Sequence, residues 1–272
     1  MIIIGEKINT SRKEVEAAVR NGDSHFIGNL ARMQAEAGAD YIDVNAGTFV
    51  NDEVAMLKWL VKTVQAVVDK PLCIDTPNPL ALAKALEVHK GKAMVNSITA
   101  KTARYDNTLP LIRDYGCAVI ALCMDDKGIP EGATERIDIA GRLYNDLLAG
   151  GVKAEDIYFD PLLRPVSVGG DSAKVALTVI EGIMRLYPSV HTICGLSNIS
   201  YGLPHRRLLN RAFLAMAVMV GLDAVILDPN DKDLMAELLA AEALSGRDEF
   251  CINYITASRE SALSSCNGLS ER

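Results

Sequence analysis

The feature of this sequence that most constrains its fold is a regular alternation of short apolar runs with longer segments of helical period. The strand candidates are Ile2–Gly5, Tyr41–Asn45, Leu72–Asp75, Ala93–Asn96, Ala118–Cys123, Ile157–Asp160, Thr192–Leu196 and Ala224–Leu227. The helix candidates are Phe26–Ala37, Asp52–Val68, Pro79–His89, Ile137–Leu148, Ser172–Leu186, Arg206–Val220 and Asp231–Leu244. Such alternation indicates a parallel sheet with crossover helices, and eight strands is the number that closes an α/β (β/α)8 TIM barrel.

An open doubly wound sheet is the alternative fold. A dinucleotide-binding sheet of that kind carries G-x-G-x-x-G after its first strand, and this chain does not. No linker, low-complexity block or internal repeat divides the 272 residues. We therefore expect a single barrel domain over residues 1–272, with a weakly patterned C-terminal tail over residues 258–272.

Composition excludes several classes of function. The net charge is −7 and no Lys/Arg-rich run occurs, so nucleic-acid binding is not expected. No apolar stretch is long enough for a signal peptide or a membrane span, which predicts a cytoplasmic protein without membrane contact. The six cysteines form no C-x-x-C pair and the four histidines have no metal-ligand spacing, so we predict reduced thiols and no bound metal. Cys73 and Cys194 fit buried apolar positions best.

Polar residues recur at the carboxyl ends of the predicted strands. These residues are Glu6 and Asn9, Asp43 and Asn45, Asp75, Asn96, Asp160, Ser197 and Asn198, and Asp228. In a barrel these ends converge on one rim, where active sites lie. A single Asp or Asn at such a position is best explained as a helix cap. Recurrence at seven of eight strands favours a functional site instead.

The residue types restrict the chemistry of this rim. No histidine stands at a strand's carboxyl end, so a Ser-His-Asp or Cys-His centre is not expected. The predicted strands contain no interior lysine for a Schiff base. Aromatic residues make up only 5% of the chain, which argues against a sugar-binding platform. Carboxylates and amides together suit the donors and acceptors of a pterin, although other polar heterocycles fit the same pattern.

Specific motifs then point to a family. They are Ile3-Ile-Gly-Glu-Lys-Ile-Asn9, Asp43-Val-Asn45, Cys73-Ile-Asp75-Thr76, Met94-Val-Asn96-Ser97, Tyr158-Phe-Asp160-Pro161-Leu162, Gly195-Leu-Ser197-Asn198-Ile-Ser200, Leu209-Asn210-Arg211 and Gly221-Leu-Asp223-Ala224. In order and spacing the chain resembles the methyltetrahydrofolate:corrinoid methyltransferases. That family belongs to the pterin-binding barrels, with dihydropteroate synthase and the folate domain of cobalamin-dependent methionine synthase. The resemblance extends to about Leu244, and its most discriminating block is Gly195–Ser200.

The resemblance implies roles for individual residues. Asp75, Asn96 and Asp160 would hold the pterin ring, with Asp160 on the pyrimidinone edge. Asn198 would be the catalytic residue, because its amide can donate a hydrogen bond to N5 of the folate as the methyl group moves. Further pterin-binding candidates are Gly195, Ser197, Asn9, Glu6, Asp43 and Asn45, and less central candidates are Tyr201, Arg206 and Asp228. Relatives often carry a Gln three residues after this Asn, where this chain has Tyr201-Gly202, as in the methionine synthase branch.

The implied substrates are tetrahydrofolate or methyltetrahydrofolate and a corrinoid (cobalamin) carried by a separate corrinoid protein, and a homodimer is expected. The segment Asp23-Ser-His25-Phe-Ile-Gly28 matches D-x-H-x-x-G, by which cobalamin-binding modules supply a histidine to cobalt. It falls where a helix should begin, so we interpret Asp23 as a helix cap and His25 as a surface residue.

Three other functions are open at this point, and so is the direction of methyl transfer. One is a dihydropteroate synthase, in which Arg164 and Arg206 would bind pyrophosphate. The others are a folate-binding protein without catalysis and a corrinoid carrier.

Overall fold

The computed structural model describes residues 1–259 and contains an eight-stranded parallel sheet rolled into a barrel. The strands are β1 (Ile2–Asn9), β2 (Tyr41–Asn45), β3 (Leu72–Asp75), β4 (Met94–Ala100), β5 (Ala118–Asp125), β6 (Ile157–Asp160), β7 (His191–Thr192) and β8 (Ala224–Leu227). They follow one another around the ring in chain order, and β1 pairs with both β2 and β8. The predicted (β/α)8 barrel is therefore confirmed, and the open sheet is not observed.

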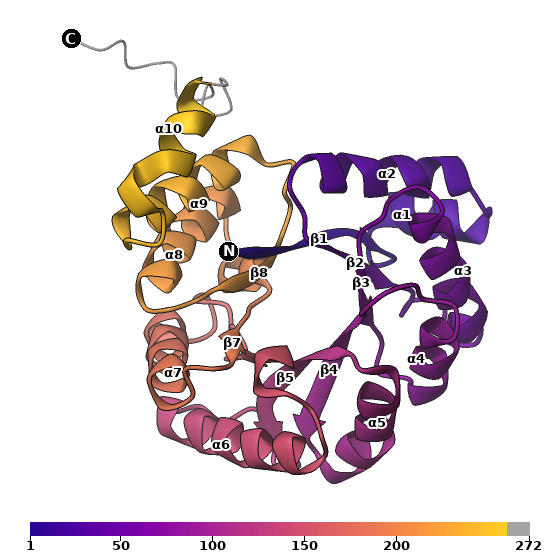
Figure 1. Ribbon diagram of the computed structural model, residues 1–272, viewed down its shortest axis with the longest axis horizontal. Coiled ribbons are helices and arrows are strands. Elements are labelled where there is room, and N and C mark those ends of the chain that lie inside the picture. Colours follow the sequence, from indigo (N-terminus) through magenta and orange to yellow (C-terminus); the bar gives the residue numbers. More distant parts are fainter. Residues whose placement is uncertain (260–272) are drawn as a thin grey trace.

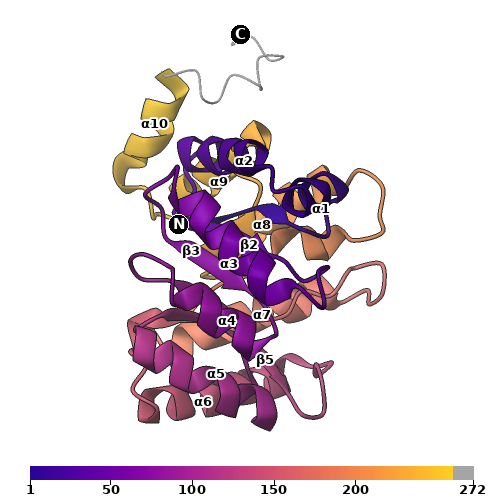
Figure 2. The same cartoon turned by 90° about the vertical axis from the view of Figure 1, so that its right-hand side faces the viewer.

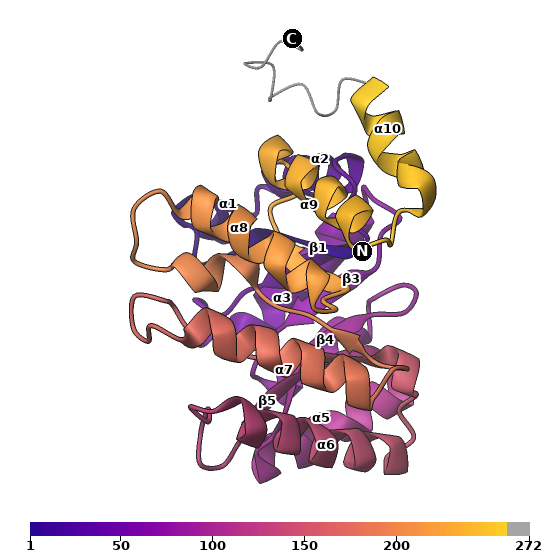
Figure 3. The ribbon, with the colours of Figure 1, turned by 90° about the vertical axis from the view of Figure 1, so that its left-hand side faces the viewer.

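Helices surround the strand ring on the outside (Figures 1 and 2). They are α1 (Lys13–Arg20), α2 (Ser24–Glu36), α3 (Glu53–Gln65), α4 (Pro79–Leu86), α5 (Thr102–Tyr115), α6 (Ala133–Ala149), α7 (Ser172–Leu186), α8 (Arg206–Met219), α9 (Lys232–Leu244) and α10 (Ile252–Arg259). Short 3-10 helices are η1 (Ala154–Asp156), η2 (Leu196–Ser200) and η3 (Glu249–Cys251). Helix α10 lies beyond α9, close to the amino terminus (Figure 3).

Buried side chains form the core in two layers. The interior of the strand ring is filled by a small cluster that includes Ile4, Met94 and Tyr158. Larger apolar clusters lie between the strands and the surrounding helices. Cys73 and Cys194 are completely buried, as expected, and both are free thiols.

Helices α1, α5 and α10 were not among the predicted elements, and among the strands the structure differs most from the prediction at β7. The strand predicted over Thr192–Leu196 is wrong, because β7 ends at Thr192 and η2 begins at Leu196. The barrel is closed here mainly by Asp223, whose carboxylate accepts hydrogen bonds from the backbone N of Thr192 (2.9 Å) and from Nδ1 of His191 (2.7 Å). One backbone bond, from the N of Ile226 to the O of Cys194 (2.9 Å), completes the closure.

The tail predicted over residues 258–272 lies mostly outside the described residues, but its first two residues belong to α10. Within residues 1–259, no helix combines the length and apolar character needed to cross a membrane. The same residues contain no cluster of three or more His, Cys, Asp or Glu side chains arranged to hold a metal ion.

Candidate active site at the carboxyl ends of the strands

A cavity of about 530 Å³ opens at the carboxyl ends of the strands. It is lined by Glu6, Asn9, Ser11, Arg12, Asp43, Asp75, Asn96, Ser97, Leu122, Asp160, Leu162, Gly195, Ser197, Asn198 and Ile226. Every strand except β7 contributes a lining residue, and the segment that follows β7 contributes Gly195, Ser197 and Asn198. All of the central site candidates lie here except Asn45.

Asn45 is not among the lining residues, but it contacts and orients one of them, Asp75. Its Nδ2 donates a hydrogen bond to Oδ2 of Asp75 (2.9 Å), and its Oδ1 accepts one from the backbone N of Gly47 (2.9 Å). Both polar ends of the amide are thus used within the protein. The structure therefore gives Asn45 a place beside a lining carboxylate and does not place it in the lining itself.

Asp43 belongs to β2, and Asp75 belongs to the neighbouring strand β3. The side chain of Asp43 is buried (4% exposed), and its Oδ1 has no hydrogen-bond partner among the described residues. Burial, together with the neighbouring charge of Asp75, raises the pKa of Asp43 well above its usual range. Burial also raises the pKa of Asp75, although the hydrogen bond from Asn45 and the charge of Arg104 oppose that shift. The floor of the cavity therefore favours a protonated carboxyl group.

Asp160 ends β6 and has one carboxylate oxygen occupied. Its Oδ1 accepts a hydrogen bond from the backbone N of Leu162 (2.7 Å). Burial raises the pKa of Asp160 to about 7, against the opposing effects of the Leu162 bond and the charge of Arg136. A carboxyl group with this pKa changes its charge in the neutral pH range.

Asn198 lies in η2 with its side chain exposed at the cavity wall. The N-cap positions of η2 and of α8 belong to Gly195 and His205, so Asn198 caps neither helix. A Cβ atom on Gly195 would lie 3.0 Å from Nδ2 of Asn198, which is closer than side chains normally approach. Glycine at position 195 thus leaves room for the Asn198 amide.

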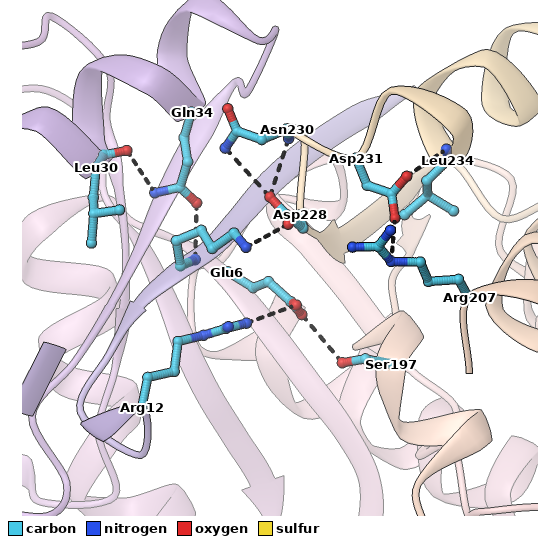
Figure 4. A network of polar contacts seen from close by, with 11 residues as sticks. Glu6, Arg12, Leu30, Gln34, Ser197, Arg207, Asp228, Asn230, Asp231 and Leu234 are labelled. Atoms are coloured by element: carbon cyan, nitrogen blue, oxygen red, sulfur yellow. Dashed lines mark hydrogen bonds and ion pairs between the residues drawn. The ribbon is translucent and has the colours of Figure 1, made fainter. Parts of the chain in front are cut away.

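Glu6 connects β1 to the turn that carries Asn198 (Figure 4). Its Oε1 accepts a hydrogen bond from Nη2 of Arg12 (3.2 Å), and its Oε2 accepts one from Oγ of Ser197 (3.3 Å). Burial is the main cause that raises the pKa of Glu6. On the other side of this turn, Nη2 of Arg206 donates to the backbone O of Ser197 (2.5 Å). The turn is therefore fixed from two directions.

The three less central candidates lie outside the main cavity. Arg206 and Asp228 line a neighbouring hollow of about 210 Å³, which shares Glu6, Arg12 and Ser197 with the cavity. Asp228 is paired there with Nζ of Lys7 (2.5 Å). Tyr201 lines neither hollow, and its side chain is 66% exposed, with the Arg206 guanidinium 5.8 Å from the ring centre.

Several lining residues were missed by the sequence analysis: Ser11, Arg12, Ser97, Leu122, Leu162 and Ile226. Ser97 directly follows the predicted Asn96, and Leu162 stands two residues after Asp160, so proximity to the motifs could have indicated both. Leu122 and Ile226 give no such signal, since they look like ordinary apolar strand residues.

The D-x-H-x-x-G match lies on the outer helix α2. The Asp23 side chain accepts a hydrogen bond from the backbone N of Phe26 (3.0 Å), which confirms the interpretation of Asp23 as a helix cap. His25 is exposed, and its Nε2 lies 3.0 Å from Nδ2 of Asn29, one turn further along the helix.

Comparisons with known proteins agree with this geometry. A family model described as "Pterin binding enzyme" matches residues 5–228. The methylcorrinoid:tetrahydrofolate methyltransferase of Eubacterium limosum is 37% identical over 262 residues, covering 96% of this chain and 97% of that protein. Methionine synthase of Mycobacterium tuberculosis (strain ATCC 25618 / H37Rv) is 30% identical over 83% of this chain, which spans only 20% of that longer protein.

Solved structures with the same fold include two dihydropteroate synthases. The Yersinia pestis structure matches with a TM-score of 0.61 and 15% identity, covering 89% of this chain and 92% of its own. The Xanthomonas albilineans structure, a complex with 7,8-dihydropteroate, gives a TM-score of 0.62 and 19% identity with the same coverage. At such identities the likeness concerns the fold alone.

Proposed function

Because this chain belongs to the pterin-binding enzyme family, we propose that it is a methyltransferase acting between N5 of tetrahydrofolate and the cobalt of a corrinoid carried by a partner protein. The observation that carries the proposal is the position of Asn198. Its amide is presented at the wall of a cavity whose other polar residues, Asp75, Asn96 and Asp160, suit a pterin. Similarity along nearly the whole chain to a methylcorrinoid:tetrahydrofolate methyltransferase supports the same reaction.

In the proposed complex the pterin ring lies among the carboxylates and amides of the strand ends. The pyrimidinone edge presents N–H and NH2 donors, and the ionised carboxylate of Asp160 accepts them. Leu162 occupies one lone pair of Oδ1, so Oδ2 and the second lone pair of Oδ1 remain for the two donors of the ligand. The Asn96 amide can serve the acceptor atoms of the ring.

The methyl group moves without a covalent enzyme intermediate. In the direction away from folate, the reduced cobalt supplies the electron pair of its new bond to the methyl carbon, the N5–methyl bond breaks with its electron pair staying on N5, and N5 takes up a proton from solvent. In the other direction the same bonds change in reverse, and N5 loses that proton. A hydrogen bond from Nδ2 of Asn198 to N5 stabilises the electron pair that develops there.

The lining residues fit this chemistry. The side chains around the cavity include no His, Cys or Lys, and the direct displacement needs no covalent intermediate on the enzyme. Acceleration would then come from positioning both substrates and from excluding water. The cavity opens at the barrel rim, so a corrinoid on a separate protein could approach N5 from outside.

We expect methylcobalamin to form from methyltetrahydrofolate and free reduced cobalamin, followed by absorbance, and the reverse reaction to proceed from methylcobalamin. Asn198→Ala should lower the rate about 100-fold while the Kd for methyltetrahydrofolate stays nearly unchanged, because the hydrogen bond to N5 acts mainly as the charge develops. Asp160→Ala should abolish binding. Asn107→Ala, which changes an exposed amide on the outer helix α5, is the matched control and should behave like wild type.

Failure of transfer in both directions despite tight folate binding would contradict the methyltransferase function. Condensation of a pterin pyrophosphate with p-aminobenzoate would then indicate a dihydropteroate synthase, and its absence would leave a folate-binding protein without catalysis. A coloured preparation that retains cobalamin would indicate a corrinoid carrier.

We also propose a cytoplasmic homodimer. Large apolar side chains near the last described helix are exposed, including Leu244 (84%) and Phe250 (82%), and such a surface suits self-association. The buried, unpaired thiols of Cys73, Cys123 and Cys194 suit a reducing compartment. Light scattering after size-exclusion chromatography would test the dimer.

A further inference from the structure

Arg136 is a buried cation that forms no ion pair with any of residues 1–259. It lies in the first turn of α6 with 2% of its surface exposed. Its guanidinium donates only to backbone carbonyl oxygens. A buried charge is costly unless its donors are satisfied. The backbone segments to which these carbonyl oxygens belong are therefore the ones that Arg136 holds in place.

The three carbonyls belong to the two loops that follow β5 and β6. Nε donates to the O of Pro130 (2.9 Å) in the first loop. Nη1 donates to the O of Pro161 (2.7 Å) and to the O of Leu162 (2.9 Å) in the second. Leu162 has a φ of 64°, a left-handed conformation that is unfavourable for leucine. The guanidinium thus binds the carbonyl oxygens of the two peptide groups that precede and follow the Cα of Leu162, the strained residue.

That strained residue determines the geometry of Asp160. The Leu162 N–H donates to Oδ1 of Asp160, which fixes the orientation of the carboxylate that lines the cavity. The positive charge of Arg136 also opposes the rise in the pKa of Asp160 that burial causes. The other titratable groups coupled to Asp160 are the buried thiols of Cys123 and Cys194, whose raised pKa values keep them neutral.

We propose that Arg136 is a positioning residue for Asp160: it clamps the loop after β6 so that the carboxylate of Asp160 faces the pterin, and its positive charge favours the ionised form of that carboxylate. The proposal rests on the proposed function only in naming the ligand as a pterin. It assigns to an outer helix, α6, control over the group that recognises the substrate.

The test measures the Kd for methyltetrahydrofolate between pH 5.5 and 8.5 in three variants. Arg136→Met removes the charge and the donors, and should raise the Kd about tenfold at pH 7, as expected for losing a charge-assisted contact network. It should also shift the midpoint of the pH dependence upward. Arg136→Lys keeps the charge, so its midpoint should stay near that of wild type while its Kd rises. Arg142→Met changes an arginine on the same helix whose side chain is 58% exposed, and should match wild type in both respects.

A second set of measurements covers the case in which Arg136→Met does not fold. Gly adopts positive φ without strain, so Leu162→Gly should restore part of the affinity lost in Arg136→Lys, after correction for the effect of Leu162→Gly alone. Wild-type Kd and pH midpoint in Arg136→Lys, with no effect of adding Leu162→Gly, would overturn the proposal.

If wild type itself does not bind methyltetrahydrofolate, the proposed function fails. The carboxyl titration of Asp160, followed by 13C NMR in the ligand-free wild type, Arg136→Lys and the neutral variant Arg136→Gln, then decides the role of Arg136: an upward shift in Arg136→Gln with an unchanged midpoint in Arg136→Lys supports it, and the same midpoint in all three proteins overturns it.

Discussion

Two carboxyl groups of the same cavity show how local surroundings separate residues of one chemical type. Asp160 accepts a backbone hydrogen bond and feels a buried cation, which limits the rise of its pKa to about 7. Asp43 has an unpartnered buried oxygen, and burial together with the charge of its neighbour Asp75 raises its pKa well above the usual range. At neutral pH one carboxyl group can thus accept the donors of a ligand while the other favours the protonated form.

Affinity for methyltetrahydrofolate should fall as the pH drops through about 7. The ionised form of Asp160 accepts the pterin donors, so each pH unit below its pKa should weaken binding about tenfold. For stability the sign is opposite: because the folded pKa exceeds the unfolded one, protonation of Asp160 favours the folded state as the pH falls from about 7 to about 4. Titration calorimetry across pH 5.5–8.5 measures the first effect. Asp160→Asn should bind weakly and lose the midpoint near pH 7, and retention of that midpoint would contradict the assignment.

Sequence reasoning located the cavity because acids and amides end the strands, and strand ends are fixed by the apolar runs before them. Asp43, Asp75 and Asp160 follow this rule. Arg136 does not, since it lies in a helix and reaches the site through backbone carbonyls that have no side-chain signature. The hydrogen bond from Asn45 to Asp75 was equally hidden, because the two residues lie 30 positions apart in the chain.

At the scale of single elements, the weak point of the barrel is β7. Only two residues pair with β6, and toward β8 a side chain, that of Asp223, replaces part of the missing strand ladder. The apolar run that predicted a longer strand is present, but Ile193 and Cys194 are buried without belonging to the regular ladder. Ile193 and Cys194 each keep a single backbone hydrogen bond, to Phe159 of β6 and to Ile226 of β8, and hydrophobicity alone could not show that the regular strand ends at Thr192.

Asp223→Ala should lower the free energy of unfolding by about 1–3 kcal/mol, because the backbone N of Thr192 and the His191 ring lose their acceptor. The hydrogen bond that His191 donates to Asp223 raises the pKa of His191. A raised histidine pKa stabilises the fold fully below about pH 6.5, and this contribution is lost as the pH rises through the folded value. The loss in Asp223→Ala should therefore be larger at pH 5.5 than at pH 8.5 in urea unfolding. Asp106→Ala, at an exposed position on α5, is the control, and equal losses at both pH values would contradict the account.

Helices were harder to predict than strands where their apolar face is small. Helix α1 has only eight residues, three of them buried, and α5 contains Pro110 and buries only Thr108 and Ile112. Helix α10 buries none of its residues, so no apolar period marked it. Each of these helices depends on neighbouring elements more than on its own pattern.

At the scale of the molecule, the cavity forms only when the whole barrel is closed, because no single part of the barrel contains all of its lining residues. Its lining includes residues of seven strands, β1 to β6 and β8, and residues of the turn that follows β7. The hydrogen bond between Ser197 and Glu6 joins residues 191 positions apart. Binding and global folding are consequently coupled.

Methyltetrahydrofolate at about 100 times its Kd should raise the free energy of unfolding by about 2.7 kcal/mol. The increment should be the same whether unfolding is followed by far-UV circular dichroism or by tryptophan fluorescence, because no separate part of the chain holds the site. p-Aminobenzoylglutamate, which lacks the pterin, should give no increment, and neither should Asp160→Ala. A ligand effect seen by only one spectroscopic probe would show that part of the barrel binds alone.

The pairing of β1 with β8 has a consequence for how the chain is made. On the ribosome the first strand emerges early, yet one of its two neighbours, Ala224–Leu227, is synthesised more than 200 residues later. Until then Ile2 lacks Asp223, the partner of its backbone N in the finished barrel. The nascent chain therefore carries an open sheet edge through most of its synthesis, and tetrahydrofolate cannot assist its folding before the last strand has appeared.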